Sequence, residues 1–115
     1  MGLFRRGGGS SRFADLIDRQ LDLFVADNAD LFRRIEAAEL AYHGADAGES
    51  SPEEATHLWG EVVDLVEEGT ELLADMRDRY AWNQLGADDQ DGYIAAFNRA
   101  VAKRLPRFGL EIENR

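Results

Sequence analysis

The sequence predicts an all-α protein: a long antiparallel helical hairpin with a shorter third helix, completed to a larger helical bundle by dimerisation. Two stretches, residues 12–43 and 52–85, repeat apolar residues in alternating steps of four and three. This heptad spacing is typical of helices that pack along a common seam. A third stretch, residues 89–105, carries one apolar stripe and is followed by a proline, which favours a short amphipathic helix.

These patterns divide the chain into a short tail and one helical domain. Residues 1–11 read as an N-terminal tail, because a Gly/Ser run follows its few apolar and basic residues. Residues 12–115 then form the domain. Within it we expect helices at 12–43, 52–85 and 89–105, a turn at 44–51 and an extended C-terminal tail at 106–115.

The second helix has the clearest start signal in the chain. Ser51 is the expected N-cap, Pro52 occupies the first helical position, and Glu54 completes a capping box. For the third helix we expect Asp88 or Asp89 as the cap.

The two long seams also predict how the hairpin is aligned. An antiparallel arrangement that places Leu31 opposite Val66 also places Asn28 opposite Gly69, so the one polar seam residue meets the one glycine. A buried polar residue at such a position can fix the register of packed helices. A small-molecule site between the helices at this point is an alternative that the pattern leaves open.

The apolar face of the hairpin is wider than two helices need, so a further layer must cover it. Trp59 lies on the seam and is expected in the core. Our candidates for a layer shared with the third helix or with a partner are four flanking apolar residues, Val25, Phe32, Leu65 and Leu72. Our candidates for a linear docking element in the tail are Leu3, Phe4, Arg5 and Arg6. A homodimer is the simplest way to bury the remaining face.

Composition excludes several classes of function. A formal net charge of −10 repels phosphate backbones, so nucleic-acid binding is not expected. The absence of cysteine excludes thiol chemistry and disulfides. No apolar run is long enough for a membrane span and no signal-peptide pattern is present, so we expect a cytoplasmic protein.

One group of residues could hold a metal. A Glu-x-x-His motif together with further glutamates is the ligand pattern of ferritin-like metal–carboxylate bundles, which bind iron or manganese. The residues concerned are Glu36, Glu39, Glu54, His57 and Glu61. Against this reading, the predicted register places Glu54 and His57 on the outer face, and Glu54 already has a capping role.

No nucleophile, catalytic base or phosphate-binding loop occurs in a recognisable context. We therefore expect a non-enzymatic interaction or assembly protein without a cofactor, for example an accessory subunit of a larger complex. The exposed face of the second helix carries a run of acidic residues, Glu61, Asp64, Glu67, Glu68, Glu71, Asp75 and Asp78. Such a run is either a solvated surface or a docking face for a basic protein partner.

Overall fold

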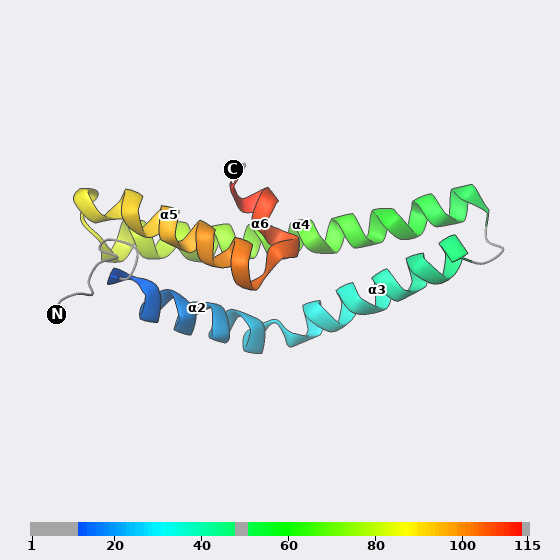
Figure 1. Cartoon of the computed structure of the whole chain (residues 1–115), viewed down its shortest axis with the longest axis horizontal. Helices are drawn as coiled ribbons and strands as arrows, with labels where there is room; N and C mark the ends of the chain where they lie inside the picture. Colours follow the sequence, from blue (N-terminus) through cyan, green and yellow to red (C-terminus); the bar gives the residue numbers. More distant parts are fainter. Residues whose placement is uncertain (1–11, 48–50, 114–115) are drawn as a thin grey trace.

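Five helices and no strand make up the part of the chain that the structure, a computed structural model, describes: residues 12–47 and 51–113 (Figure 1). The helices are α2 (Ala14–Asp27), α3 (Ala29–Ala47), α4 (Pro52–Gln84), α5 (Ala87–Arg104) and α6 (Pro106–Glu113). The predicted all-α class is confirmed. None of these helices is both long and apolar enough to cross a membrane.

The long helix α4 begins where the sequence predicts. The Ser51 hydroxyl oxygen accepts a hydrogen bond from the backbone N–H of Glu54 at 3.1 Å, and Pro52 is the first helical residue. The cap satisfies one of the N–H groups that a helix start leaves without an internal partner. At the other end Leu85 leaves the helical conformation, so α4 ends within one residue of the predicted boundary.

The first predicted helix is not continuous, because it breaks at Asn28. This residue has φ −116° and ψ 29°, and its side-chain amide donates a hydrogen bond to the Phe24 carbonyl oxygen at 2.9 Å. The Phe24 carbonyl also accepts the backbone N–H of Asn28 at 3.0 Å, so two donors share one acceptor at the end of α2. The predicted helix 12–43 is therefore wrong as a single element. Its second part, α3, continues to Ala47, through residues 44–47 of the predicted turn.

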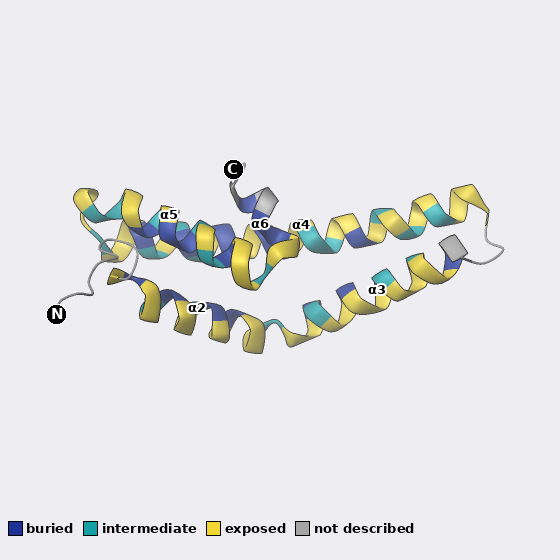
Figure 2. Ribbon diagram, in the orientation of Figure 1, coloured by how far each residue is buried: buried dark blue, intermediate teal, exposed yellow. Residues whose placement is uncertain are grey.

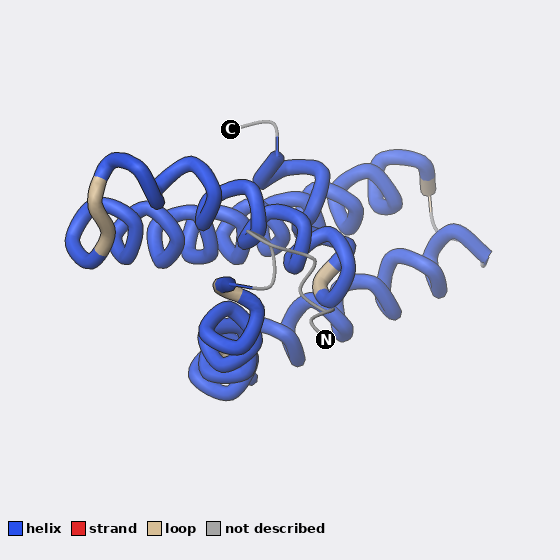
Figure 3. The backbone as a smooth tube through the Cα atoms, turned by 60° about the vertical axis from the view of Figure 1, so that its left-hand side comes forward, coloured by secondary structure: helices blue, strands red, loops and turns tan. Residues whose placement is uncertain are grey.

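The break changes the predicted hairpin. Of the two parts of the first predicted helix, only α3 runs along α4. The other part, α2, packs mainly against α5 and points in a different direction (Figures 1 and 3). The side chains nearest to Gly69 are Phe108 of α6 and Leu31 of α3, in place of the predicted Asn28. A Cβ atom placed on Gly69 would lie 2.5 Å from Phe108 Cε1 and 3.3 Å from Leu31 Cδ2. These two side chains lie against Gly69, where the sequence leaves a small-molecule site open.

The C-terminal segment is helical, which corrects the predicted extended tail at 106–115. Pro106 ends α5 but also occupies the first position of α6, where its missing N–H costs nothing. Phe108 and Ile112 are one helical turn apart, and both are buried. The burial of this pair favours the helix, since a strand would need a neighbouring strand to satisfy its backbone.

The helix α5 starts slightly earlier than predicted. Its N-cap is Gly86, which offers no side-chain cap, so the predicted cap at Asp88 or Asp89 is wrong. Both aspartates lie in the first turn, where the helix dipole favours negative charge. Asp89 forms an ion pair with Arg12 at 2.8 Å and so ties the start of the described chain to α5.

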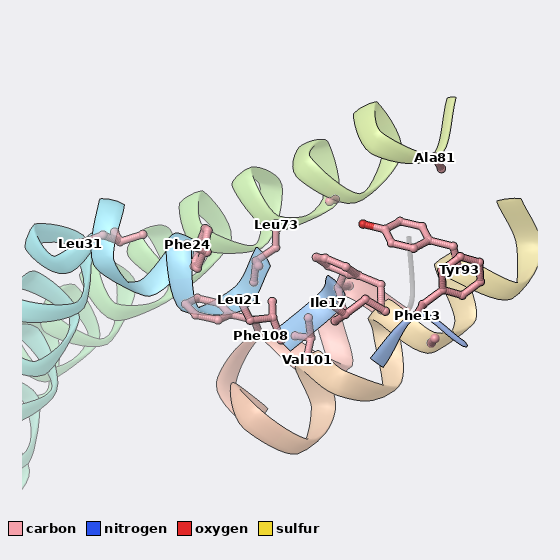
Figure 4. Close-up of a cluster of buried hydrophobic side chains, with 14 of the residues drawn as sticks. Phe13, Ile17, Leu21, Phe24, Leu31, Leu73, Ala81, Tyr93, Val101 and Phe108 are labelled. Carbon is pink, nitrogen blue, oxygen red and sulfur yellow. The ribbon is translucent and has the colours of Figure 1, made fainter. Parts of the chain in front are cut away.

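The hydrophobic core lies where α2, α5, α6 and the second half of α4 meet (Figure 4). Phe108 is at its centre, with ring centroids 6.4 Å from Phe24 and 5.9 Å from Phe32 in edge-to-face arrangements. Such arrangements suit the charge distribution of aromatic rings. The apolar stripe predicted for the third helix faces the core, because its residues Tyr93, Phe97 and Val101 are all fully buried.

The molecule is elongated, with dimensions of 60 × 31 × 24 Å and a radius of gyration of 17.5 Å. A compact domain of this length would have a radius of about 13 Å. The extra length comes from a two-helix arm, which we define as residues 35–47 of α3 and 52–66 of α4. Figure 2 shows that buried positions in this arm are restricted to the sides where the two helices face each other.

The close packing at Gly69 gives a first prediction. Replacing Gly69 with alanine should lower the free energy of unfolding by about 1–3 kcal/mol, since Phe108 is held between Phe24 and Phe32 and cannot move aside freely. The control is Gly60→Ala in the same helix, where a Cβ meets nothing within 4 Å. That change should raise the free energy of unfolding by about 0.5–1 kcal/mol, as measured by urea denaturation. Equal effects of the two changes would contradict the observed packing.

The buried phenol of Tyr93 gives a second prediction. Its hydroxyl donates to Gln20 Oε1 at 2.7 Å, and burial raises the pKa of Tyr93 from 10.0 to about 12. The folded state therefore holds this proton more tightly than the unfolded chain does. The stabilisation that the protonated phenol gives to the folded state is complete below pH 10 and is lost between pH 10 and 12. Between pH 10 and 12 the free energy of unfolding should therefore fall by roughly 2–3 kcal/mol more in the unmodified protein than in Tyr93→Phe. Parallel stability curves for the two proteins would disprove this.

Candidate interaction surface

The side chains of the predicted metal set are not brought together. Glu36, Glu54, His57 and Glu61 are exposed, and Glu39 is half-buried. Glu39 accepts a hydrogen bond from Arg107 at 2.9 Å and so links α3 to α6. Across residues 12–47 and 51–113, no three histidine, aspartate or glutamate side chains are grouped in a way that could hold a metal ion. The iron or manganese alternative therefore has no geometric support in this part of the chain.

The four residues proposed for a shared layer separate into two groups. Phe32 and Leu65 pack against the core, and the Phe32 ring lies 5.9 Å from that of Phe108 in α6. Val25 and Leu72 lie on the surface, with exposed fractions of 37% and 41%. The layer that covers Phe32 is therefore α6 rather than the predicted third helix. The tail residues Leu3, Phe4, Arg5 and Arg6 lie outside the described residues.

Trp59 is not the core residue that the heptad pattern predicts. Its side chain is 49% exposed, and its ring packs on that of Tyr42 at 5.1 Å between centroids. Val63, one turn further along α4, is 37% exposed. The heptad spacing places Trp59 toward α3, but the arm is only two helices thick. No third helix of the described chain covers the outer half of the indole ring.

A groove of about 300 Å³ begins at this tryptophan and runs to the start of α6. Its apolar lining comes from Trp59, Val62, Val63 and Val66 of α4 and from Pro106 of α6, with Glu39, Glu67 and Arg107 at its polar rim. The α4 residues follow the spacing i, i+3, i+4, i+7, so they form a continuous row on one face of the helix. Sequence reasoning missed this groove because Pro106 and Arg107 were assigned to an extended tail.

Of the acidic run on α4, only Glu67 lines the groove, whereas Glu61, Asp64 and Glu68 line a separate hollow between α3 and α4. The acidic run includes Glu67 at the groove and extends to Asp75 and Asp78, which form ion pairs with Arg79 and Arg77. The whole chain carries a formal net charge of −10. The groove is thus an apolar row with Glu67 and the Glu39–Arg107 ion pair at its rim, on a chain of net negative charge. This arrangement is suited to binding a complementary protein surface.

No protein-family model, curated protein or solved structure matches this chain. The site is therefore interpreted from its own geometry and chemistry.

The exposure of Trp59 gives a third prediction, which concerns stability. Trp59→Ala should lower the free energy of unfolding by about 1 kcal/mol, since half of the side chain is already in water. The matched control is Leu73→Ala in the same helix, which should cost about 3 kcal/mol because Leu73 is fully buried. Chemical denaturation measures both values. A larger loss for Trp59→Ala than for Leu73→Ala would show that the tryptophan supports the fold instead.

Proposed function

We propose that this chain is a non-enzymatic protein-interaction or assembly protein, and that the groove beside Trp59 is its docking surface. The observation that carries the proposal is a large aromatic side chain left half-exposed beside Val63, a second exposed apolar residue of the same row. Tryptophan is enriched among the residues that contribute most to protein–protein binding energy. An exposed indole next to a valine row therefore supports a binding role better than a structural one.

The form of the groove supports a helical partner. The row formed by Trp59, Val62, Val63 and Val66 presents apolar side chains along nearly two turns of α4. A second amphipathic helix can lay its own apolar row against such a face, as in other helix-in-groove complexes. Pro106 closes one end of the row, so the partner helix would approach from the open side of the arm.

The charge of the surface supports a basic partner. Glu39 at the rim is paired with Arg107, but Glu67 also flanks the apolar row and the chain carries a net charge of −10, which steers a positively charged surface toward it at low salt. A homodimer formed through the same face would bring like charges together, which costs binding energy. The dimer expected from the sequence remains a prediction, and the experiment below distinguishes it from a basic partner.

The test is affinity capture from the native host at low salt with a Trp59→Ala/Val63→Ser variant. We expect one stoichiometric partner on the unmodified protein and at least a tenfold reduction on the variant, because both anchors of the row are removed. The matched control is Leu40→Ser, which changes an exposed apolar residue on α3 and should retain the partner.

Two results would contradict the proposal. A partner retained by the Trp59→Ala/Val63→Ser variant would place the docking surface elsewhere. Alternatively, light scattering could show a dimer of the purified protein that the variant dissociates, and the occupant of the groove would then be a second copy rather than a basic partner.

A further inference from the structure

A second groove lies at the other end of the molecule, between α2 and α4. It has a volume of about 390 Å³ and is bordered by Gln20 of α2 and by Met76, Arg79, Tyr80, Asn83 and Gln84 of α4. Met76, Tyr80 and Asn83 are spaced at i, i+4, i+7 and so form a row along α4. The groove exists because α2 packs mainly against α5, so that α2 borders this side of α4 only through Gln20.

The groove has an apolar floor and walls that are already held in place. Met76 and Tyr80 are half-buried and supply a thioether and an aromatic ring. Gln20 is fixed by the hydrogen bond from Tyr93, and Arg79 is ion-paired with Asp75. Because these polar groups have partners, the groove is better suited to apolar side chains than to a charged ligand.

The described chain begins beside this groove. Arg12 is tied to Asp89, and the Phe13 ring lies 5.5 Å from that of Tyr93. The Tyr93 ring lies in turn 5.0 Å from Tyr80 on the groove floor. Phe13 is therefore linked to Tyr80 through the buried ring of Tyr93, which places the start of the described chain near the groove.

Residues 1–11 have the composition and length to occupy it. Leu3 and Phe4 are adjacent apolar residues, and the run Gly7-Gly8-Gly9-Ser10-Ser11 separates them from the domain. A Gly/Ser-rich linker between Phe4 and Arg12 has a root-mean-square span of roughly 16 Å. This span exceeds the ring-to-ring distances of 5.5 and 5.0 Å taken together, which leaves chain length to pass around the buried Tyr93 ring.

We propose that Leu3 and Phe4 dock into the groove of their own chain, with the Phe4 ring against Met76 and Tyr80. A thioether beside an aromatic ring is a favourable contact. Because the linker is short, the tail experiences an effective concentration in the millimolar range, so even a weak contact is well populated. This goes beyond the function proposed above, which uses the groove at the opposite end of α4, and neither proposal requires the other.

Met76 provides a direct probe, because Met1 and Met76 are the two methionines of the chain. The full chain is labelled with ¹³C-methyl methionine, and the Met76 signal is assigned by its loss in Met76→Leu. Docking of Phe4 places a ring over this methyl group, so we expect its ¹H signal to move to higher field than in Phe4→Ala. The matched control is Arg5→Ala/Arg6→Ala, which keeps both apolar residues and should leave the signal near its unmodified position.

A peptide of residues 1–11 adds a second measurement. Titrated into Phe4→Ala, it should return the Met76 signal saturably toward the position seen in the unmodified protein. Identical Met76 signals in the unmodified protein and in Phe4→Ala would overturn the proposal. A signal that moves with protein concentration would also overturn it, since the tail would then occupy a second copy. Neither failure would affect the partner-capture result at Trp59, because that experiment reads a different groove.

Discussion

The packing of the Phe108 ring on Gly69 is the contact on which the arrangement of the helices depends. Because glycine has no side chain, the ring can lie directly against the backbone of α4. From there it touches Phe24 of α2 and Phe32 of α3, so one residue of the shortest helix joins three others. Any larger residue at position 69 would push α6 outward and open the centre of the core.

The sequence predicts helix content and the start of α4 well, because periodicity and capping are local signals. It fails at Asn28 and around Phe108 for two different reasons. At Asn28 the chain leaves the helical conformation although the heptad pattern continues, and the side-chain amide bonds back to the Phe24 carbonyl. At the C-terminus Phe108, Leu110 and Ile112 alternate as in a strand, but Phe108 and Ile112 also lie one helical turn apart. Only the tertiary contact with Gly69 distinguishes these two interpretations.

The candidate surfaces were harder to predict than the helices because both depend on where α2 and α6 lie. Trp59 and Met76 occupy regular heptad positions, and in a continuous hairpin both would be covered. Once the chain turns at Asn28, α2 no longer covers Met76, and the arm that contains Trp59 stands apart from the core (Figure 2). Periodicity identifies residues that can be buried, but it does not specify whether another helix packs over them.

The uneven thickness of the molecule has a consequence for its internal motions. The arm relies on a narrow strip of buried side chains, including Ala38 and Val62, whereas the other end is closed by four helices. Local opening costs less free energy where fewer apolar contacts are broken, so the arm forms a separate cooperative unit of lower stability. Its amide protons will exchange with solvent through openings that leave the rest of the fold intact. The α3–α4 end can therefore adjust the spacing of its two helices to a bound surface without disturbing the core.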